Sequence, residues 1–356
     1  MNNFRQQYVT RMCVGVEQEA SQQDVNKLFD SSKDYNLERF REFSWKFRLL
    51  PPFRRKIWKV LLQVLPEYRE NDERIIASRL HEAELLFNCL KTTRELECLE
   101  VRRKQTSGNS APMILHIASS TRSTVDGELS DSDSTIVETN EKENIPGQLV
   151  STLDRPSAID LATMILLSDG MIHERRTLKK SYPYYIPVCE QMLILCEPEN
   201  WADAFHLSRR VLKLMAKTFG DEDQMRKTLN EIHERLAKEI EMNSGLCERA
   251  TFGKLPIRHW LLGAGTQIIH TPRALQRFWD KLLTGEASRV LMVHLIVELL
   301  ITIDKRFGDD LHMSCEFRLS DEGDMRLVGR VLDQVAKSGG RKSTSDIRRP
   351  RVPNIL

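Results

Sequence analysis

The chain has little glycine and proline for its 356 residues, 16 and 13 respectively, and no excess of charge of either sign. Its formal net charge of +2 favours neither nucleic acid nor an anionic membrane surface as the main partner. The seven cysteines are odd in number, scattered, and never in CxxC spacing, which argues against a disulfide framework or a zinc site. We therefore expect reduced, mostly buried thiols in a cytoplasmic protein that does not bind nucleic acid.

The sequence also lacks an apolar run long enough for a membrane span, which needs about 20 apolar residues. The longest candidate, Val290 to Ile303, is interrupted by His294 and Glu298 and is followed by three charged residues. Its apolar residues lie on nearly every side of a helical wheel, as in a helix surrounded by other helices. The start, MNNFRQQYVTRMC, has no apolar segment typical of a secretory signal. We therefore predict that this segment is a central core helix, that the protein is not an integral membrane protein, and that it has no secretory signal.

No stretch shows a strand pattern long enough to build a sheet, whereas helical spacing recurs along the chain. A helix is predicted over 36–47, and the two prolines at 51 and 52 end it before the next helix begins. A longer helix is predicted from near Pro66 to Val101. Its expected inward stripe consists of Ile76, Leu80, Ala83, Phe87 and Leu90. Two further helices over 272–307, broken at Gly285, complete a pattern that predicts a single large all-α domain.

Residues of about 102–156 are rich in Ser, Thr, Asp, Glu and Gly and have no sustained period. Such a segment cannot bury enough apolar surface to offset its ordering entropy, so we predict a disordered insertion in the domain. It contains serines among acidic residues and a KEN sequence, which suggest phosphorylation and a degron; a solvated loop is the alternative. The predicted plan is a helical extension over 1–35, the domain over 36–310, a helix over 311–338 and a mobile basic tail over 339–356.

Motifs that would carry chemistry are sparse. Gly263 to Gly265 is a lone GxG without a preceding strand, and the sequence has no GxxxxGK[ST] phosphate loop. His294 and Glu298 are one helical turn apart and could share a metal ion, but without a third ligand a hydrogen-bonded core pair is favoured. We expect no catalytic residue, no cofactor and no metal site.

Separate blocks of the sequence resemble the TBC-domain family. An early RxxxW element runs from Arg54 to Trp58; a late LPxxxW element ends at Trp260, and ALQRFWDK contains Trp279 and Asp280. The resemblance spans roughly residues 40–307 without the insertion. It implies an all-helical domain, and most members are GTPase-activating proteins for Rab GTPases. These five signature residues are expected to be structural, with Trp58 in the core and Arg54 as a buried or half-buried hydrogen-bond donor to neighbouring loops.

The two catalytic groups of the family have no counterpart in this sequence. Active members use an arginine from IxxDxxR and a glutamine from YxQ. None of the six tyrosines has a glutamine two residues later, and both DxxR sequences, starting at Asp223 and Asp346, lack the preceding isoleucine. The resemblance therefore transfers no catalytic residue. A displaced arginine at Arg175 or Arg176 is the alternative.

Within the family, blocks such as WKVLLQVLP and RFWDK are most similar to the TBC-domain subunit of the tuberous sclerosis complex. That resemblance implies a non-catalytic subunit that binds the hamartin coiled coil and stabilises an assembly in which tuberin activates the GTPase Rheb and restrains TOR signalling. It also implies a cytoplasmic protein, held peripherally on lysosomal or other vesicle membranes through its complex. The alternative is a Rab GTPase-activating protein with non-standard catalytic residues.

Overall fold

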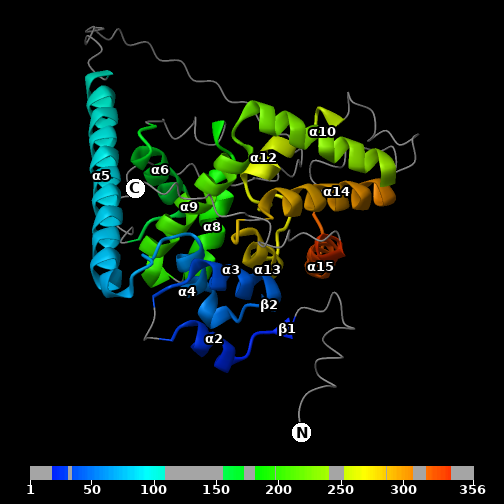
Figure 1. The fold of residues 1–356 in the computed structure, drawn as a ribbon. Helices are drawn as coiled ribbons and strands as arrows, with labels where there is room; N and C mark the ends of the chain where they lie inside the picture. The colour runs from blue at the N-terminus through cyan, green and yellow to red at the C-terminus, as the bar shows by residue number, and fades with distance from the viewer. Residues whose placement is uncertain are drawn as a thin grey trace, which may run out of the picture. The chain divides into compact units, whose positions relative to one another are not determined.

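The computed structural model describes residues 18–30, 34–108, 155–171, 181–196, 198–239, 252–285, 287–307 and 318–337. Over these ranges the chain is almost entirely helical (Figure 1). The one strand pair there joins β1 (Gln18–Glu19) to β2 (Phe47–Arg48) in parallel. The all-α prediction is confirmed. Several sequence-based predictions concern residues outside the described ranges: the displaced arginine at Arg175 or Arg176, most of the disordered insertion, and the basic tail.

Two compact units divide the chain: a larger one of Met1–Phe87 with Arg155–Leu356, and a smaller one of Asn88–Asp154. The larger unit begins with α2 (Gln22–Leu28), α3 (Leu37–Lys46), α4 (Pro51–Leu61), η1 (Arg69–Asn71) and the first part of α5 (Asp72–Gly108). It continues with α6 (Ala158–Ser168), α8 (Tyr185–Cys196), η2 (Pro198–Asn200), α9 (Trp201–Phe219), α10 (Glu222–Glu239), α12 (Ile257–Leu262), α13 (Pro272–Leu282), α14 (Ser288–Phe307) and α15 (Asp321–Lys337).

Local sequence explains where several of these helices begin. The Asn36 side chain accepts a hydrogen bond from the backbone N–H of Arg39 and so caps α3. Pro51 opens α4, at a position where a missing N–H costs nothing. Ser157 and Asp160 form a reciprocal capping box at the start of α6. These short-range signals are legible in the sequence without knowledge of the fold.

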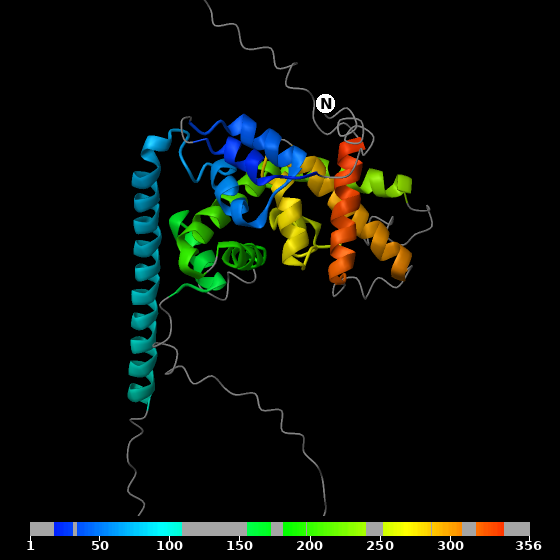
Figure 2. The same ribbon diagram turned by 90° about the horizontal axis from the view of Figure 1, so that it is seen from below.

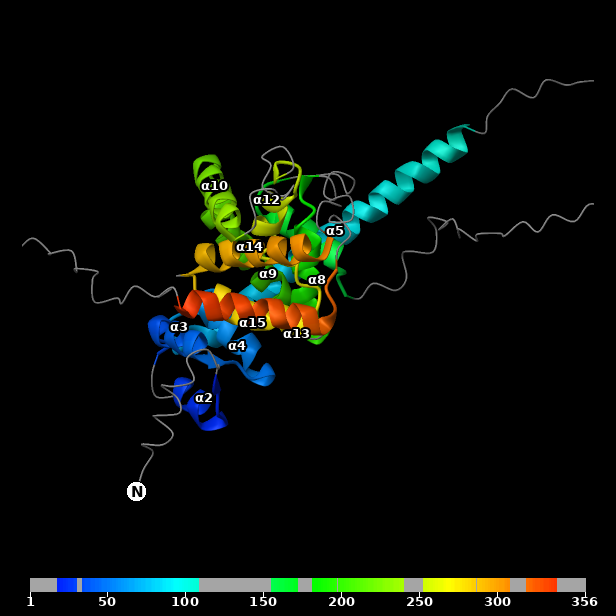
Figure 3. The ribbon, with the colours of Figure 1, turned by 90° about the vertical axis from the view of Figure 1, so that its right-hand side faces the viewer.

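α14 is a core helix, as the sequence predicted. Leu291, Met292, Leu295, Ile296 and Leu300 are fully buried. α10, α13 and α15 pack against it; α15 lies beside α14 in Figures 2 and 3. No helix among the described residues is both long and apolar enough to span a bilayer.

The predicted inward stripe of α5 is partly wrong. Ala83 and Phe87 are buried, and the Phe87 ring lies 5.6 Å from that of Trp201, but Ile76 and Leu80 are 43% and 44% exposed. Helical spacing identifies residues that share a face, but it does not reveal how far along that face a neighbour extends. The helix also continues to Gly108, beyond the predicted end at Val101 and into the start of the predicted insertion; the first four of these residues, Arg, Arg, Lys and Gln, favour helix.

Candidate functional site

Three family-signature residues, Arg54, Trp58 and Asp280, meet in one buried cluster. α4 places Arg54 and Trp58 one turn apart on the same face, and α13 supplies Asp280. The Arg54 guanidinium donates from Nε to one carboxylate oxygen of Asp280 at 2.9 Å and from Nη2 to the other at 3.0 Å. The indole N–H of Trp58 donates to the same carboxylate at 3.0 Å. The signature residues therefore form a bidentate ion pair with a third donor.

The Arg54 guanidinium has partners at each of its nitrogens. Besides Asp280, Nη1 donates to the Gln276 side chain and Nη2 to the Leu49 carbonyl, both at 3.0 Å. The prediction that Arg54 is a buried donor is confirmed, since the residue is 5% exposed. Its expected partners were only partly right: Leu49 precedes α4, but the main partner is a helix residue 226 positions away.

Burial dominates the electrostatics of Asp280. Desolvation raises the pKa of its carboxyl group, and the Arg54 guanidinium, the Lys281 ammonium and the Trp58 N–H, which favour the charged form, oppose this rise. Taking the Arg54 and Asp280 charges out of water costs free energy. The hydrogen bonds offset this cost because every nitrogen of the guanidinium and both carboxylate oxygens are paired. With no solvent-facing reactive atom, this cluster supports a structural role and not a catalytic one.

Lys281, next to Asp280, was not singled out by the sequence. Its buried ammonium donates to the carbonyl oxygens of Ser44, Trp45 and Phe47 at 2.6, 2.9 and 2.8 Å. These carbonyls belong to the last turn of α3 and the residue after it, where no intrahelical donor is available. The positive charge also faces the negative end of the helix dipole. Lys281 thus caps a helix in a distant part of the chain.

The turn between α12 and α13 is held by the Trp279 side chain and by the backbone of Trp260. The indole N–H of Trp279 donates to the Ala264 carbonyl at 2.8 Å, and the Trp260 carbonyl accepts from the Gly265 N–H at 3.1 Å. Gly265 has φ +80°, and a Cβ there would lie 2.9 Å from a methyl carbon of Leu295 in α14. The GxG is therefore a tight turn packed on the core helix.

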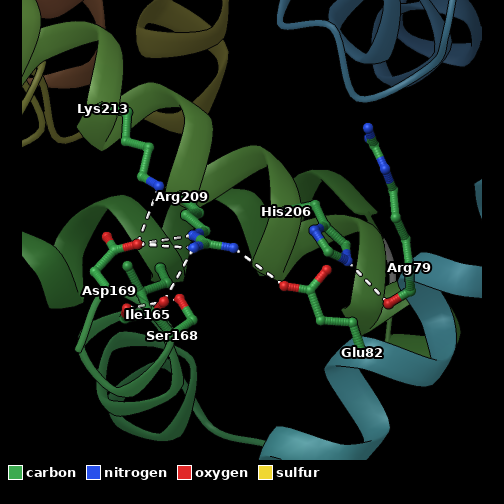
Figure 4. Close-up of polar contacts among 8 residues, drawn as sticks. All are labelled: Arg79, Glu82, Ile165, Ser168, Asp169, His206, Arg209 and Lys213. Carbon is green, nitrogen blue, oxygen red and sulfur yellow. Dashed lines mark hydrogen bonds and ion pairs between the residues drawn. The ribbon is translucent and has the colours of Figure 1, made fainter.

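A second polar cluster, absent from the sequence-based candidates, joins the start of α5, the end of α6 and α9 (Figure 4). Arg209 donates to the Asp169 carboxylate at 2.8 Å, to the Ser168 carbonyl at 3.2 Å and to Glu82 at 3.1 Å. Lys213 adds an ion pair to Asp169 at 3.0 Å. Because acidic partners hold the Arg209 guanidinium, this residue does not project as an arginine finger would.

His206 lies in the same region, on the buried side of α9. Its Nε2 is 2.9 Å from the Arg79 carbonyl oxygen in α5, so this nitrogen carries the proton and donates. Burial lowers the pKa of the imidazole. The contact, seen in Figure 4, ties α9 to α5 and exposes no reactive atom.

His294 and Glu298 both have hydrogen-bond partners. His294 contacts Arg235 and Gln334, and Glu298 accepts from Arg330 at 2.8 Å and from Gln334. Gln334 bridges the two side chains, so both are hydrogen-bonded, as the sequence favoured. In the described part of the chain, no group of three or more His, Cys, Asp or Glu residues is placed to hold a metal ion.

The exposed apolar surface gathers on α5. Seven large apolar side chains are exposed among the described residues, and five of them lie on this helix: Ile76, Leu80, Leu85, Leu96 and Leu99. In the smaller unit, Leu96 and Leu99 are 58% and 51% exposed, and the exposed Cys89 and Thr92 precede them. The spacing 89, 92, 96 and 99 alternates steps of three and four, as positions a and d of a coiled coil do, with the polar Thr92 at one of them. We call these four residues the α5 seam.

Comparison of the sequence with protein-family models and with known proteins finds no match. The TBC-domain resemblance stays a prediction that rests on the quoted sequence blocks. What the geometry adds is that Arg54, Trp58 and Asp280 contact one another, although they come from distant parts of the chain.

Proposed function

We propose that the protein is a non-catalytic binding subunit that docks α5 against a partner coiled coil. The α5 seam is the observation that carries this proposal. Leu96 and Leu99 are each more than half exposed and lie three residues apart on this seam, so they leave apolar surface in water that a second helix would bury. A partner helix with its own apolar seam fits this surface.

The absence of the catalytic side chains from the sequence supports a binding role over an enzymatic one. A trans-acting arginine finger accelerates GTP hydrolysis by about 10³ to 10⁵, or roughly 4 to 7 kcal/mol of transition-state stabilisation. Neither family motif that supplies the arginine or the glutamine occurs in this chain. The signature arginine that is described, Arg54, is buried in an ion pair.

By resemblance, the proposed partner is the hamartin coiled coil, with tuberin completing the assembly. In that assembly the subunit stabilises hamartin and so supports Rheb GTPase activation by tuberin and negative regulation of TOR signalling. The proposed location is cytoplasmic, peripheral on lysosomal or other vesicle membranes through the complex. Glu95 is exposed beside the α5 seam, where coiled coils place the charges that select a partner.

The proposal is tested by co-purification of the full chain with a hamartin coiled-coil fragment. The double substitution Leu96→Glu/Leu99→Glu is expected to weaken binding by at least roughly 100-fold, because each buried leucine contributes about 1.5–3 kcal/mol. Leu80→Glu is the matched control, since Leu80 is also exposed on α5 but lies about 140° around the helix from the seam.

Two outcomes contradict the proposal. If the unmodified chain does not co-purify with the fragment, hamartin is not the partner. If the double variant binds as tightly as the unmodified chain, the α5 seam is not the binding surface. The competing function, a Rab GTPase-activating protein with non-standard residues, is tested with the same preparation in single-turnover GTP hydrolysis across a Rab panel. A binding subunit leaves the hydrolysis rate unchanged, whereas strong acceleration by the purified chain overturns the proposal.

A further inference from the structure

His294 stands in the middle of a hydrogen-bonded chain that joins three helices of the larger unit. Its Nε2 is 2.8 Å from Nη1 of Arg235 on α10, and its Nδ1 is 2.9 Å from Oε1 of Gln334 on α15. The Gln334 amide in turn donates to Glu298, one turn along α14 from His294. α14 is thereby tied to both neighbours through one imidazole.

The partners determine which nitrogen carries the proton. An arginine guanidinium only donates, so Nε2 of His294 must accept through its lone pair. Nδ1 then carries the hydrogen and donates to the Gln334 oxygen, which leaves the Gln334 NH₂ group to donate to Glu298. This is the one pattern in which every contact pairs a donor with an acceptor, and it requires a neutral imidazole.

The charged groups around His294 leave no free carboxylate next to Nε2. From α10, Arg235 faces the ring, and Glu231 is bound by Arg235 and by Arg289, at 2.8 and 2.9 Å. On α14 itself, Glu298 accepts from Arg330 of α15 at 2.8 Å and from Gln334. The charged group closest to Nε2 is therefore the Arg235 guanidinium, and its carboxylate partner Glu231 is shared with Arg289.

We propose that His294 is a proton-sensitive latch that holds α10 against α14. A proton added at Nε2 removes the lone pair that Arg235 needs and sets two like charges at hydrogen-bond distance. Arg235 must then withdraw, and α10 loses this tie to the core helix. The face that α10 turns inward carries the buried Met225, Ile232 and Leu236, so local opening uncovers apolar surface.

The electrostatics of the ring agree with this geometry. Burial lowers the pKa of His294 and the Arg235 charge lowers it further, while the Gln334 hydrogen bond, Glu298 and Glu231 oppose these effects. An opened or unfolded histidine titrates near its ordinary pKa of about 6.5. Since the latched imidazole binds a proton less readily than the open one, the latch is intact above that pH and is lost as pH falls below it.

Hydrogen–deuterium exchange of the full chain at pH 7.5 and pH 5.5, corrected for intrinsic exchange rates, tests the latch locally. The amides of α10 are expected to lose protection several-fold more than those of α6, whose capping box contains no histidine. His294→Gln keeps an acceptor that cannot titrate and is expected to abolish this difference. His233→Gln, on α10 itself, is the matched control and should retain it.

A second variant and a direct readout keep the test decisive if His294→Gln does not fold. Arg235→Met should raise the pKa of His294 and remove the pH response of α10, and imidazole ¹⁵N shifts of the unmodified chain should show the Nδ1–H form at pH 7.5. Equal protection of α10 at both pH values, or an Nε2–H form, overturns the latch. No partner is needed, so the result is independent of the proposed binding function.

Discussion

Lys281 shows how one side chain can end a helix to which it does not belong. Its three N–H groups all go to backbone carbonyls around the end of α3, and the side chain is buried. Lys281→Met removes all three bonds and leaves buried carbonyls without donors. We expect the free energy of unfolding to fall by about 2–4 kcal/mol in urea titrations. Lys217→Met, at an exposed position on α9, should change it by no more than about 0.5 kcal/mol; equal effects would refute the capping role.

Asp280 contributes as an acceptor: its carboxylate accepts hydrogen bonds from the signature residues Arg54 and Trp58. Asp280→Ala strands the Arg54 guanidinium and the Trp58 N–H in the core, at a cost of about 3–5 kcal/mol measured by chemical unfolding. Removing the arginine as well, in Arg54→Met/Asp280→Leu, should recover most of that loss, since neither charge of the ion pair is then left buried without its partner. A double variant as unstable as Asp280→Ala would contradict the ion-pair account.

Single helices depend on caps that come from elsewhere in the chain. Asp324, near the start of α15, accepts from the backbone N–H groups of His270 and Thr271 at 2.8 Å each, just before α13 begins. Asp324→Ala leaves both donors unpaired, and we expect it to lower the midpoint of thermal unfolding, equivalent to about 1–3 kcal/mol. Asp321→Ala is the matched control, because the exposed Asp321 accepts from the Thr271 hydroxyl and from no backbone N–H in the described part of the chain; an equal shift would argue against the cap.

Across the larger unit, one buried and one half-buried histidine make stability depend on pH. Burial lowers the pKa of both His206 and His270. Each therefore takes up a proton on unfolding once the pH drops below about 6.5, the ordinary histidine value, so stability is present above that pH and declines below it. We expect a lower melting temperature at pH 5.5 than at pH 7.5, with a smaller difference in His206→Gln. An unchanged melting temperature in the unmodified protein would contradict this prediction.

Helix positions followed from the sequence to a large extent, whereas the candidate sites followed only in part. Arg54, Trp58 and Asp280 were named as structural from the resemblance, but nothing local indicated that they contact one another. Lys281 and Arg209 were missed, because a charged residue on a helix is usually solvated and only its neighbours reveal another role. Ile76 and Leu80 were wrongly assigned to the inward face of α5, because helical spacing does not show where a covering neighbour ends.

The sequence alone determined where several helices begin and which helix is apolar on all sides, because caps, prolines, turn glycines and periodicity act over a few residues. Gly285, with φ +84°, lies in the break between α13 and α14, where the pattern predicted one. Only the tertiary structure decided which face of α5 meets water and which groups hold Arg54 and Lys281. Those contacts join residues 226 and 237 positions apart, and no local rule specifies a partner at that separation.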